Sequence, residues 1–310
     1  METERRGLDN PDLVRRPRAP PFAYYREYAP CTALRDYVYA YYSFTPTSVP
    51  ERRLLVSETV FRDGDSFDAP VFADSQISLS FDFDAACDPT GKWKTRTAPT
   101  VAHILGPMTI AKPATHLDHS ESVGIYFKPG QAAVFLLAPA RLLTDRSVTL
   151  QDVWGIRAHY LHQELGETVP SERIDRLERA LLVALARQRT SGLDITGLTR
   201  RVTAARGRVK VEQLAQEAGV SRQALSRAFV ERVGVPPKLY CMLSRFHAGL
   251  TFAGRGKTVD WSRSAEELGY ADQSHMIREF QRFATLTPQQ VAVGEWFHPF
   301  IERARKSRAP

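Results

Sequence analysis

Two stretches near the C-terminus repeat one another, and any fold for the chain has to accommodate both. Residues 219–229 read Gly-Val-Ser-Arg-Gln-Ala-Leu-Ser-Arg-Ala-Phe, and residues 269–280 read Gly-Tyr-Ala-Asp-Gln-Ser-His-Met-Ile-Arg-Glu-Phe. A shift of 50 positions places Ala215, Glu217 and Gly219 on Ala265, Glu267 and Gly269, and a shift of 51 places Ser221, Arg227, Phe229 and Pro237 on Asp272, Arg278, Phe280 and Pro288. This repeat of a helix, a glycine turn and a capped second helix predicts a pair of helix-turn-helix units.

Each copy carries the local signals of two short helices. Gly219 and Gly269 stand where a first helix ends and a left-handed residue is favoured. Ser221 and Asp272 are good N-caps for the helix that follows. That helix has one apolar stripe in each copy, formed by Leu225, Phe229 and Val233 in the first and by Met276, Phe280 and Phe283 in the second.

Polar side chains lie off each stripe, near the N-terminal end of the second helix. They are Arg222, Gln223, Ser226 and Arg227 in the first copy and Gln273, Ser274, His275 and Arg278 in the second. Long polar groups at this place can read base edges in a major groove of double-stranded DNA. A solvated face of an ordinary amphipathic helix has the same appearance, but the repetition in one register favours the DNA-binding interpretation.

Residues 198–291 resemble the DNA-binding domain of the AraC/XylS family of transcription regulators. The most specific part is the run 269–291, with Asp-Gln-Ser-His, Arg-Glu-Phe and Leu-Thr-Pro. The resemblance implies seven helices in two subdomains joined by a long helix at about 237–253. It assigns base contacts to Gln223, Ser226 and Arg227 in the first subdomain and to Gln273, Ser274, His275 and Arg278 in the second. RNA polymerase is a partner by the same resemblance.

The chain departs from the family pattern at two places in the second copy. Ser264 pairs with Leu214, where an apolar residue is usual. Ala284-Thr285 stands where the first copy has Val233-Gly234. We expect these changes to loosen the packing of the second subdomain and to leave its reading face intact.

The distribution of charge supports a nucleic-acid partner for the C-terminal part. The 310 residues carry a net charge of +7, and residues 193–310 hold 19 Lys and Arg against 11 Asp and Glu. The remaining residues hold 23 against 24 and are nearly neutral. Excess basic charge confined to one part of the chain is what phosphate neutralisation requires.

Cysteine usage and hydropathy indicate a cytoplasmic protein with no membrane partner. Cys31, Cys87 and Cys241 are scattered and form no Cys-x-x-Cys pair, which suits a reducing compartment. No apolar run reaches the roughly 18 residues of a membrane helix, and the polar stretch 1–21 lacks a signal-peptide core. We expect 1–21 to be a disordered tail and 293–310 a basic tail.

The first half of the chain has strand patterning. Apolar and polar residues alternate over 77–84, over 123–127 and over 38–44, with Pro and Gly between these runs. The pattern predicts an antiparallel β-domain over 22–150. Gly106-Pro107 and the runs 123–130 and 143–155 make this domain similar to the cupin-like sensor domains often fused to AraC-type readers. The predicted class is therefore α+β, with a cupin-like β-barrel before an all-α reader at 193–292.

Metal or enzyme chemistry in a cupin-like domain is an alternative. His103, His116 and His119, with Glu121 nearby, are the candidate ligands, but a His-x-x-His spacing does not put both side chains on one strand face. No nucleophile signature has recognisable surroundings. We expect no metal, no cofactor and no enzymatic activity, and keep a cupin-type enzyme with an accessory DNA-binding domain as the competing class.

Two features bear on regulation. A β-domain offers a cavity for a small-molecule effector, and tyrosines crowd residues 24–44, where they line either a pocket or a core. Residues 151–192 contain a helical stripe formed by Ile174, Leu177, Leu181, Leu182 and Leu185. It either makes a homodimer contact or covers the β-domain. The sequence thus predicts a DNA-binding transcription regulator, controlled through an effector or through dimerisation alone.

Overall fold

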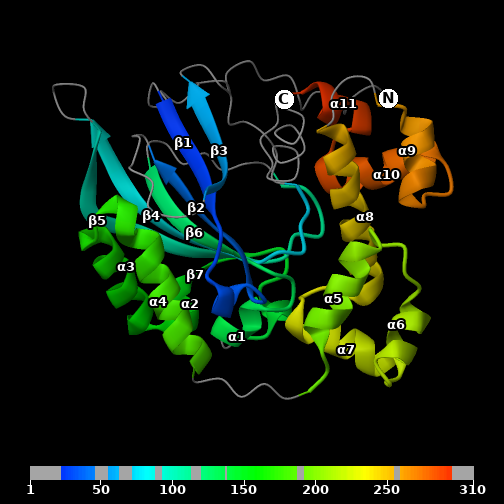
Figure 1. The fold of residues 1–310 in the computed structure, drawn as a ribbon, viewed down its shortest axis with the longest axis horizontal. Helices are drawn as coiled ribbons and strands as arrows, with labels where there is room; N and C mark the ends of the chain where they lie inside the picture. Colours follow the sequence, from blue (N-terminus) through cyan, green and yellow to red (C-terminus); the bar gives the residue numbers. More distant parts are fainter. Residues whose placement is uncertain are drawn as a thin grey trace, which may run out of the picture.

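The computed structural model describes residues 22–45, 55–62, 72–87, 93–112, 120–136, 138–186, 192–254 and 259–294. The predicted tails at 1–21 and, beyond Gly294, at 295–310 lie outside these residues, as do residues 187–191 of the predicted segment 151–192. The described part forms a β-domain and a helical domain that lie side by side (Figure 1).

The N-terminal domain is built on an antiparallel sheet, as predicted. Its strands are β1 (Phe22–Tyr28), β2 (Val38–Thr45), β3 (Leu55–Arg62), β4 (Ser78–Cys87), β5 (Trp93–Leu105), β6 (Ser120–Phe127) and β7 (Ser147–Thr149). Their order is β3-β1-β2-β6-β4-β5-β7. Within the described strands β3 and β7 are edges that do not pair with each other, so the sheet is open there rather than closed into a barrel.

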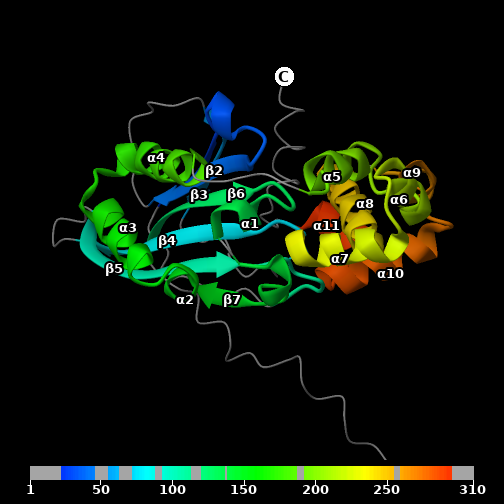
Figure 2. The ribbon, with the colours of Figure 1, turned by 90° about the horizontal axis from the view of Figure 1, so that it is seen from below.

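Helices cover one face of this sheet (Figures 1 and 2). They are the 3-10 helices η2 (Thr32–Leu34), η3 (Ala140–Leu142) and η4 (Pro170–Glu172) and the α-helices α1 (Ala132–Leu136), α2 (Leu150–Trp154), α3 (Ile156–Glu167) and α4 (Arg173–Ala186). The alternating apolar residues of β4 and β6, such as Phe81 and Ile125, are fully buried in the core beneath them.

The stripe on α4 packs inward. Ile174, Leu177 and Leu181 belong to the same core as the sheet. At the start of α4 the Arg173 guanidinium lies 3.1 Å from the Glu121 carboxylate, and both side chains are 3% exposed. The sequence left open whether this stripe forms a homodimer contact or covers the β-domain. In the structure it covers the sheet.

The tyrosine-rich segment contributes to both faces of the sheet. Tyr41 is buried in the core under the helices. On the other face Tyr25 stacks on Tyr42 with ring centroids 6.1 Å apart, and Tyr42 lies 4.7 Å from Tyr126. Gly124 makes room for this stack, because a Cβ there would be 2.3 Å from Tyr42 Cζ. Tyr25, Tyr41 and Tyr42 therefore act as packing residues of the β-domain.

The described residues of the C-terminal domain form seven helices, the number that the family resemblance implied. They are α5 (Ile195–Ala204), α6 (Val211–Glu217), α7 (Arg222–Arg232), α8 (Pro237–Ala253), α9 (Trp261–Leu268), α10 (Gln273–Ala284) and α11 (Pro288–Val293). The long helix α8 joins one unit around α7 to a second around α10 (Figure 1). Each unit has its own apolar core, and α8 contributes to both.

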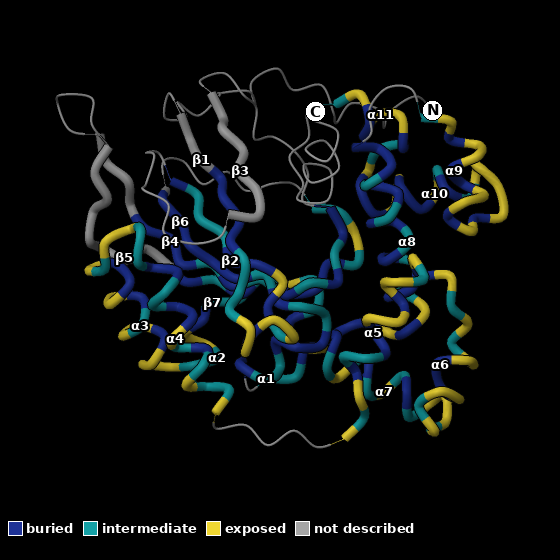
Figure 3. The backbone as a smooth tube through the Cα atoms, viewed as in Figure 1, coloured by how far each residue is buried: buried dark blue, intermediate teal, exposed yellow. Residues whose placement is uncertain are grey.

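Buried residues lie in the interior of each helix-turn-helix unit, and exposed residues lie on its outer side (Figure 3). The stripe residues Leu225, Phe229 and Val233 are fully buried, as are Met276, Phe280 and Phe283. In the described part of the chain no helix is both long and apolar enough to cross a membrane.

Candidate DNA-binding surface

The predicted caps and turns of both units are confirmed. The Ser221 side chain accepts from the Ala224 amide, and the Asp272 side chain accepts from the His275 amide. Gly219 and Gly269 have φ of 66° and 77°, the left-handed values expected between two helices of a unit. The sequence therefore determines where α7 and α10 begin.

Most of the predicted base-reading side chains are exposed. Arg222, Gln223 and Arg227 extend to solvent from α7, and Gln273, Ser274 and Arg278 from α10, whereas Ser226 and His275 are half-buried. Arg222 Nη1 donates to the Glu212 carboxylate of α6 at 3.0 Å, with both side chains mostly exposed. Such a surface pair is weak, so Arg222 can exchange Glu212 for a phosphate or a base.

His275 differs from the other candidates because it is held by the interior of its own unit. Its Nε2 lies 3.3 Å from Glu279 Oε1, one turn further along α10, and its ring meets Tyr270 edge-on at 5.4 Å. Glu279 is 4% exposed and also accepts from Arg245 Nη2 of α8 at 2.5 Å. His275 therefore lies against a buried carboxylate that is shared with Arg245.

Sequence reasoning missed the set formed by Arg245, Tyr270 and Glu279. The Arg245 guanidinium lies 4.5 Å over the Tyr270 ring and joins α8 to α10 through Glu279. Burial raises the pKa of the Tyr270 phenol well above its usual value. The available signal was a Glu on the stripe side of α10, next to Phe280, where a charged residue needs a buried partner.

The two departures from the family pattern are accommodated locally. Ser264 is buried, and its hydroxyl donates to the Asp260 carbonyl at 2.7 Å. Thr285 ends α10 with φ of 60°, a left-handed value that is strained for a β-branched residue. The second core nevertheless stays closed, with Phe280, Phe283 and Ala284 fully buried.

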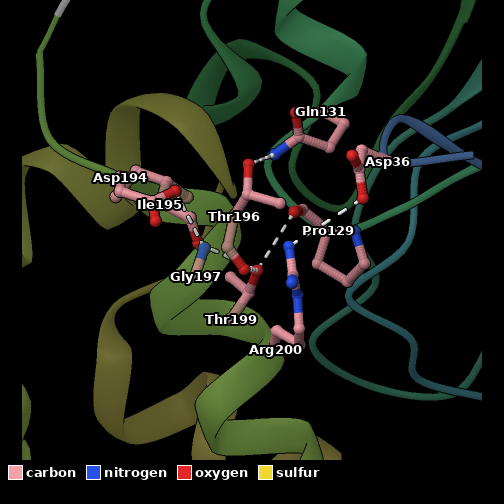
Figure 4. A network of polar contacts seen from close by, with 9 residues as sticks. All are labelled: Asp36, Pro129, Gln131, Asp194, Ile195, Thr196, Gly197, Thr199 and Arg200. Carbon is pink, nitrogen blue, oxygen red and sulfur yellow. Dashed lines mark hydrogen bonds and ion pairs between the residues drawn. The ribbon is translucent and has the colours of Figure 1, made fainter. Parts of the chain in front are cut away.

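The β-domain contacts the helical domain at α5. Gln131 Nε2 donates to Thr196 Oγ1 at 2.6 Å, and Thr199 Oγ1 donates to the Pro129 carbonyl at 3.5 Å (Figure 4). Arg200 lies 3.9 Å from Asp36, with both groups largely exposed. This contact is polar and involves α5 rather than α7 or α10.

A second contact reaches α7. Arg141 of η3 donates to Glu231 of α7 at 2.9 Å and lines a shallow hollow with Ser226 and Arg227. Sequence reasoning did not find Arg141, because nothing local marks a residue whose role depends on a partner 90 positions away.

A cavity of about 550 Å³ lies between the two domains. Its β-domain side includes Lys128 and Asp36, and its helical side includes Arg200, Arg206 and Phe252. The Arg206 guanidinium lies 5.9 Å over the Phe252 ring. Burial lowers the pKa of Lys128, Asp36 opposes this effect, and the nearby Arg200 and Arg35 lower the pKa further. The cavity thus combines an apolar wall with a cluster of cations.

The candidate metal ligands of the β-domain do not converge in the described chain. Glu121 is paired with Arg173, and among the described residues no three His, Cys, Asp or Glu side chains are placed to hold a metal ion. His116 and His119 lie outside the described residues.

Two family models match the chain. Residues 214–292 match a helix-turn-helix domain, and residues 26–149 match a domain of unknown function, DUF6597. No curated protein sequence matches the chain. The helix-turn-helix match covers α7 and α10 with their predicted reading faces.

Several solved structures are similar at low identity. ToxT from Vibrio cholerae O395 is 12% identical with a TM-score of 0.38, over 74% of this chain and 94% of that one. Unsaturated fatty acid bound wild-type ToxT from Vibrio cholerae strain SCE256 is 13% identical with a TM-score of 0.37, over 73% and 89%. ToxT from Vibrio cholerae O395 bound to (E)-4-(8-methylnaphthalen-1-yl)but-3-enoic acid is 12% identical with a TM-score of 0.40, over 74% and 95%. A likeness at this level says nothing about the ligand of this chain.

Two capped recognition helices on one long connecting helix, with a matching family model, define a DNA-binding transcription regulator. The arrangement of this domain, with two capped helix-turn-helix units on one long helix, resembles that of AraC-type regulators.

Proposed function

We propose that the regulator reads double-stranded DNA with α7 and α10 in successive major grooves. The observation that carries this proposal is the matched pair of N-capped helices with exposed polar residues at equivalent positions. Arg222, Gln223, Ser226 and Arg227 face one half-site, and Gln273, Ser274 and Arg278 face the other. His275 contributes through the ring edge that Glu279 and Tyr270 leave accessible. Half-sites read from one DNA face lie about one turn, roughly 10 bp, apart.

The test selects duplexes that the full chain binds from a random-sequence library. The expected result is two short conserved motifs about 10 bp apart, with affinity that falls steeply as salt rises. A single short motif, or binding without any sequence preference, would contradict the proposal. Binding to two such motifs would favour a regulator over a cupin-type enzyme. The proposal includes no enzymatic activity.

The proposal also includes a small-molecule effector in the cavity between the domains. Three cationic side chains, Lys128, Arg200 and Arg206, line it against one acid, Asp36. An anionic group would relieve the repulsion among these cations, and the wall at Phe252 would cover an apolar body. A volume of about 550 Å³ suits a small organic molecule. The proposed effector is therefore a small organic anion with an apolar part.

A thermal-shift screen of the full chain tests this. Aliphatic and aromatic carboxylates should raise the melting temperature, and their uncharged amides should not. Lys128→Met, which keeps most of the side-chain stem, should reduce the shift. A true effector must also change DNA affinity, and DNA must change effector affinity by the same factor. Equal stabilisation by acids and amides would contradict the anion proposal.

Contact with RNA polymerase and a homodimer belong to the proposal by family resemblance alone. The proposed place of action is the cytoplasm, where the DNA target lies. The proposed domains are a β-domain at 22–150, a helical segment at 151–192 and the reader at 193–292.

A further inference from the structure

The β-domain contacts both helix-turn-helix units at the same part of each unit, the C-terminal end of the recognition helix. At the first unit, Thr144 Oγ1 donates to the Gly234 carbonyl at 2.7 Å, just beyond α7. At the second, the Ala73 amide donates to the Phe283 carbonyl at 2.8 Å, in the last turn of α10. The Phe283 carbonyl is one of the last of α10, which lack partners within the helix, so an outside donor is effective there.

Each contact is closely packed. A Cβ at Gly234 would lie 2.8 Å from Pro107 Cγ and 2.9 Å from Thr144 Oγ1, so glycine allows this approach. At the second unit Phe72 is 2% exposed and enters the core of the unit, with its ring 6.3 Å from that of Phe246. His247 Nε2 of α8 lies 3.2 Å from the Ala73 carbonyl.

One segment of the β-domain, residues 106–109, connects the two contacts. Met108 exchanges both backbone hydrogen bonds with Asp74, at 2.7 and 3.0 Å, directly after Ala73. The Pro107 carbonyl accepts from the Asp145 amide at 2.7 Å, directly after Thr144. The Asp145 carboxylate in turn accepts from the Thr109 amide and hydroxyl, each at 2.7 Å.

We propose that residues 72–74, 106–109 and 140–145 form a bracket that sets the relative orientation of the two recognition helices for DNA. Without the bracket, the described connections between the units are α8 and the packing of Arg208 of the first unit against Gly269 of the second. With the bracket, the second unit is already oriented for its half-site when the first unit is bound. The two units then lose less orientational freedom on binding, and the affinity for the intact duplex is higher. The inference rests on the proposed function, since it requires that both units read DNA. It assigns to the β-domain a part in DNA recognition that acts through the orientation of the two units.

The test uses Thr144→Val, which removes the hydroxyl donor and keeps the side-chain shape. The probes are the duplex selected by the wild-type chain and a second duplex with one half-site scrambled. Thr144→Val should weaken binding to the intact duplex about three- to tenfold and leave binding to the scrambled duplex unchanged. Thr196→Val is the matched control, because it removes a hydroxyl from the contact between Gln131 and α5 and should change neither affinity.

A second readout does not depend on affinity. Spin labels at the exposed positions Gln213 and Glu266, one on each unit, should give a narrow distance distribution in the wild type. The distribution should broaden in Thr144→Val and in Ala73→Pro, which lacks the amide donor to Phe283. Unchanged distances and unchanged affinity for the intact duplex would overturn the bracket, and so would tighter binding by the variants. If the wild type fails to distinguish the two duplexes, it is the proposed function that fails.

Discussion

Gly234 and Thr285 stand at equivalent positions of the two helix-turn-helix units, 51 residues apart, and both have left-handed backbone, with φ of 90° and 60°. The first unit meets this requirement with the residue best suited to it. The second meets it with a β-branched residue, for which the left-handed conformation costs about 1–2 kcal/mol.

Thr285→Gly should therefore stabilise the protein. Relief of the strain outweighs the larger chain entropy of glycine, and the free energy of unfolding should rise by roughly 0.5–1 kcal/mol. Urea denaturation measures it. Thr285→Ala is the control, because it removes the branch but keeps a Cβ, and its gain should be smaller. A loss of stability in Thr285→Gly would show that the Thr285 hydroxyl, which donates to the Ala284 carbonyl, matters more than the backbone.

Arg227→Ala and Arg278→Ala should each relax the base preference of a different half-site. The two arginines are exposed on α7 and α10 at equivalent positions, and loss of a base contact costs about 1–3 kcal/mol. Binding to duplexes mutated in one half-site at a time measures the effect. Arg263→Ala, an exposed arginine of α9 paired with Glu267, should leave the preference unchanged. A uniform loss over all sequences would mean phosphate contacts instead.

Glu279→Gln should destabilise the second unit far more than a surface change of the same kind. It leaves Arg245, which is only 15% exposed, without its charged partner, and breaking such a pair costs about 3 kcal/mol. Glu267→Gln is the matched control, because its partner Arg263 is 78% exposed and its loss should cost under about 0.5 kcal/mol. Thermal or urea unfolding measures both, and equal small losses would contradict the buried-pair interpretation.

His162 should make the β-domain less stable in mild acid. Its ring packs edge-on against Phe81 and Phe83. Burial lowers the pKa of His162, and the hydrogen bond to the Asp82 carbonyl raises it. The nearby side chains of His159, Arg173 and His103 lower this pKa further. The unfolded chain then binds a proton more readily than the folded chain. Stability is therefore complete above the ordinary histidine pKa of about 6.5 and falls as the pH drops below it.

His162→Gln keeps a donor for the Asp82 carbonyl and does not titrate. The difference in unfolding free energy between pH 7 and pH 5 should be smaller in this variant than in the wild type. His159→Gln, an exposed histidine on the same helix, is the control and should keep the wild-type dependence. An unchanged pH dependence in His162→Gln would assign the acid sensitivity to other groups.

The part of this protein that could be predicted is the part whose signals are local. Ser221, Asp272 and the glycines before them are caps and turns that act within a few residues, and the 51-residue repeat places both units in one register. The strand at β4 was also predictable, because its alternation between Leu79, Phe81 and Phe83 has a period of two.

What could not be predicted depends on residues far apart in the chain. Glu279 needs Arg245, Phe72 needs Phe246, and Thr144 needs Gly234, and no periodicity links the members of such a pair. The order of the strands in the sheet could not be predicted for the same reason, since alternation predicts strands but not which edges pair.

The reader is predicted to bind DNA without the β-domain, but with reduced stability. A fragment of residues 193–310 keeps both capped recognition helices and all of the basic excess, so its affinity should fall steeply with rising salt. It loses Phe72, which is 2% exposed in the core of the second unit, and exposes the apolar surface of Phe246. Phe72→Ala in the full chain should lower the unfolding free energy of the second unit by about 3 kcal/mol, and hydrogen exchange in α10 and α11 measures it. Wild-type protection of these helices in the fragment would show that the second unit is complete without the β-domain. The salt-dependent binding of the fragment would then be the property of an independent reader.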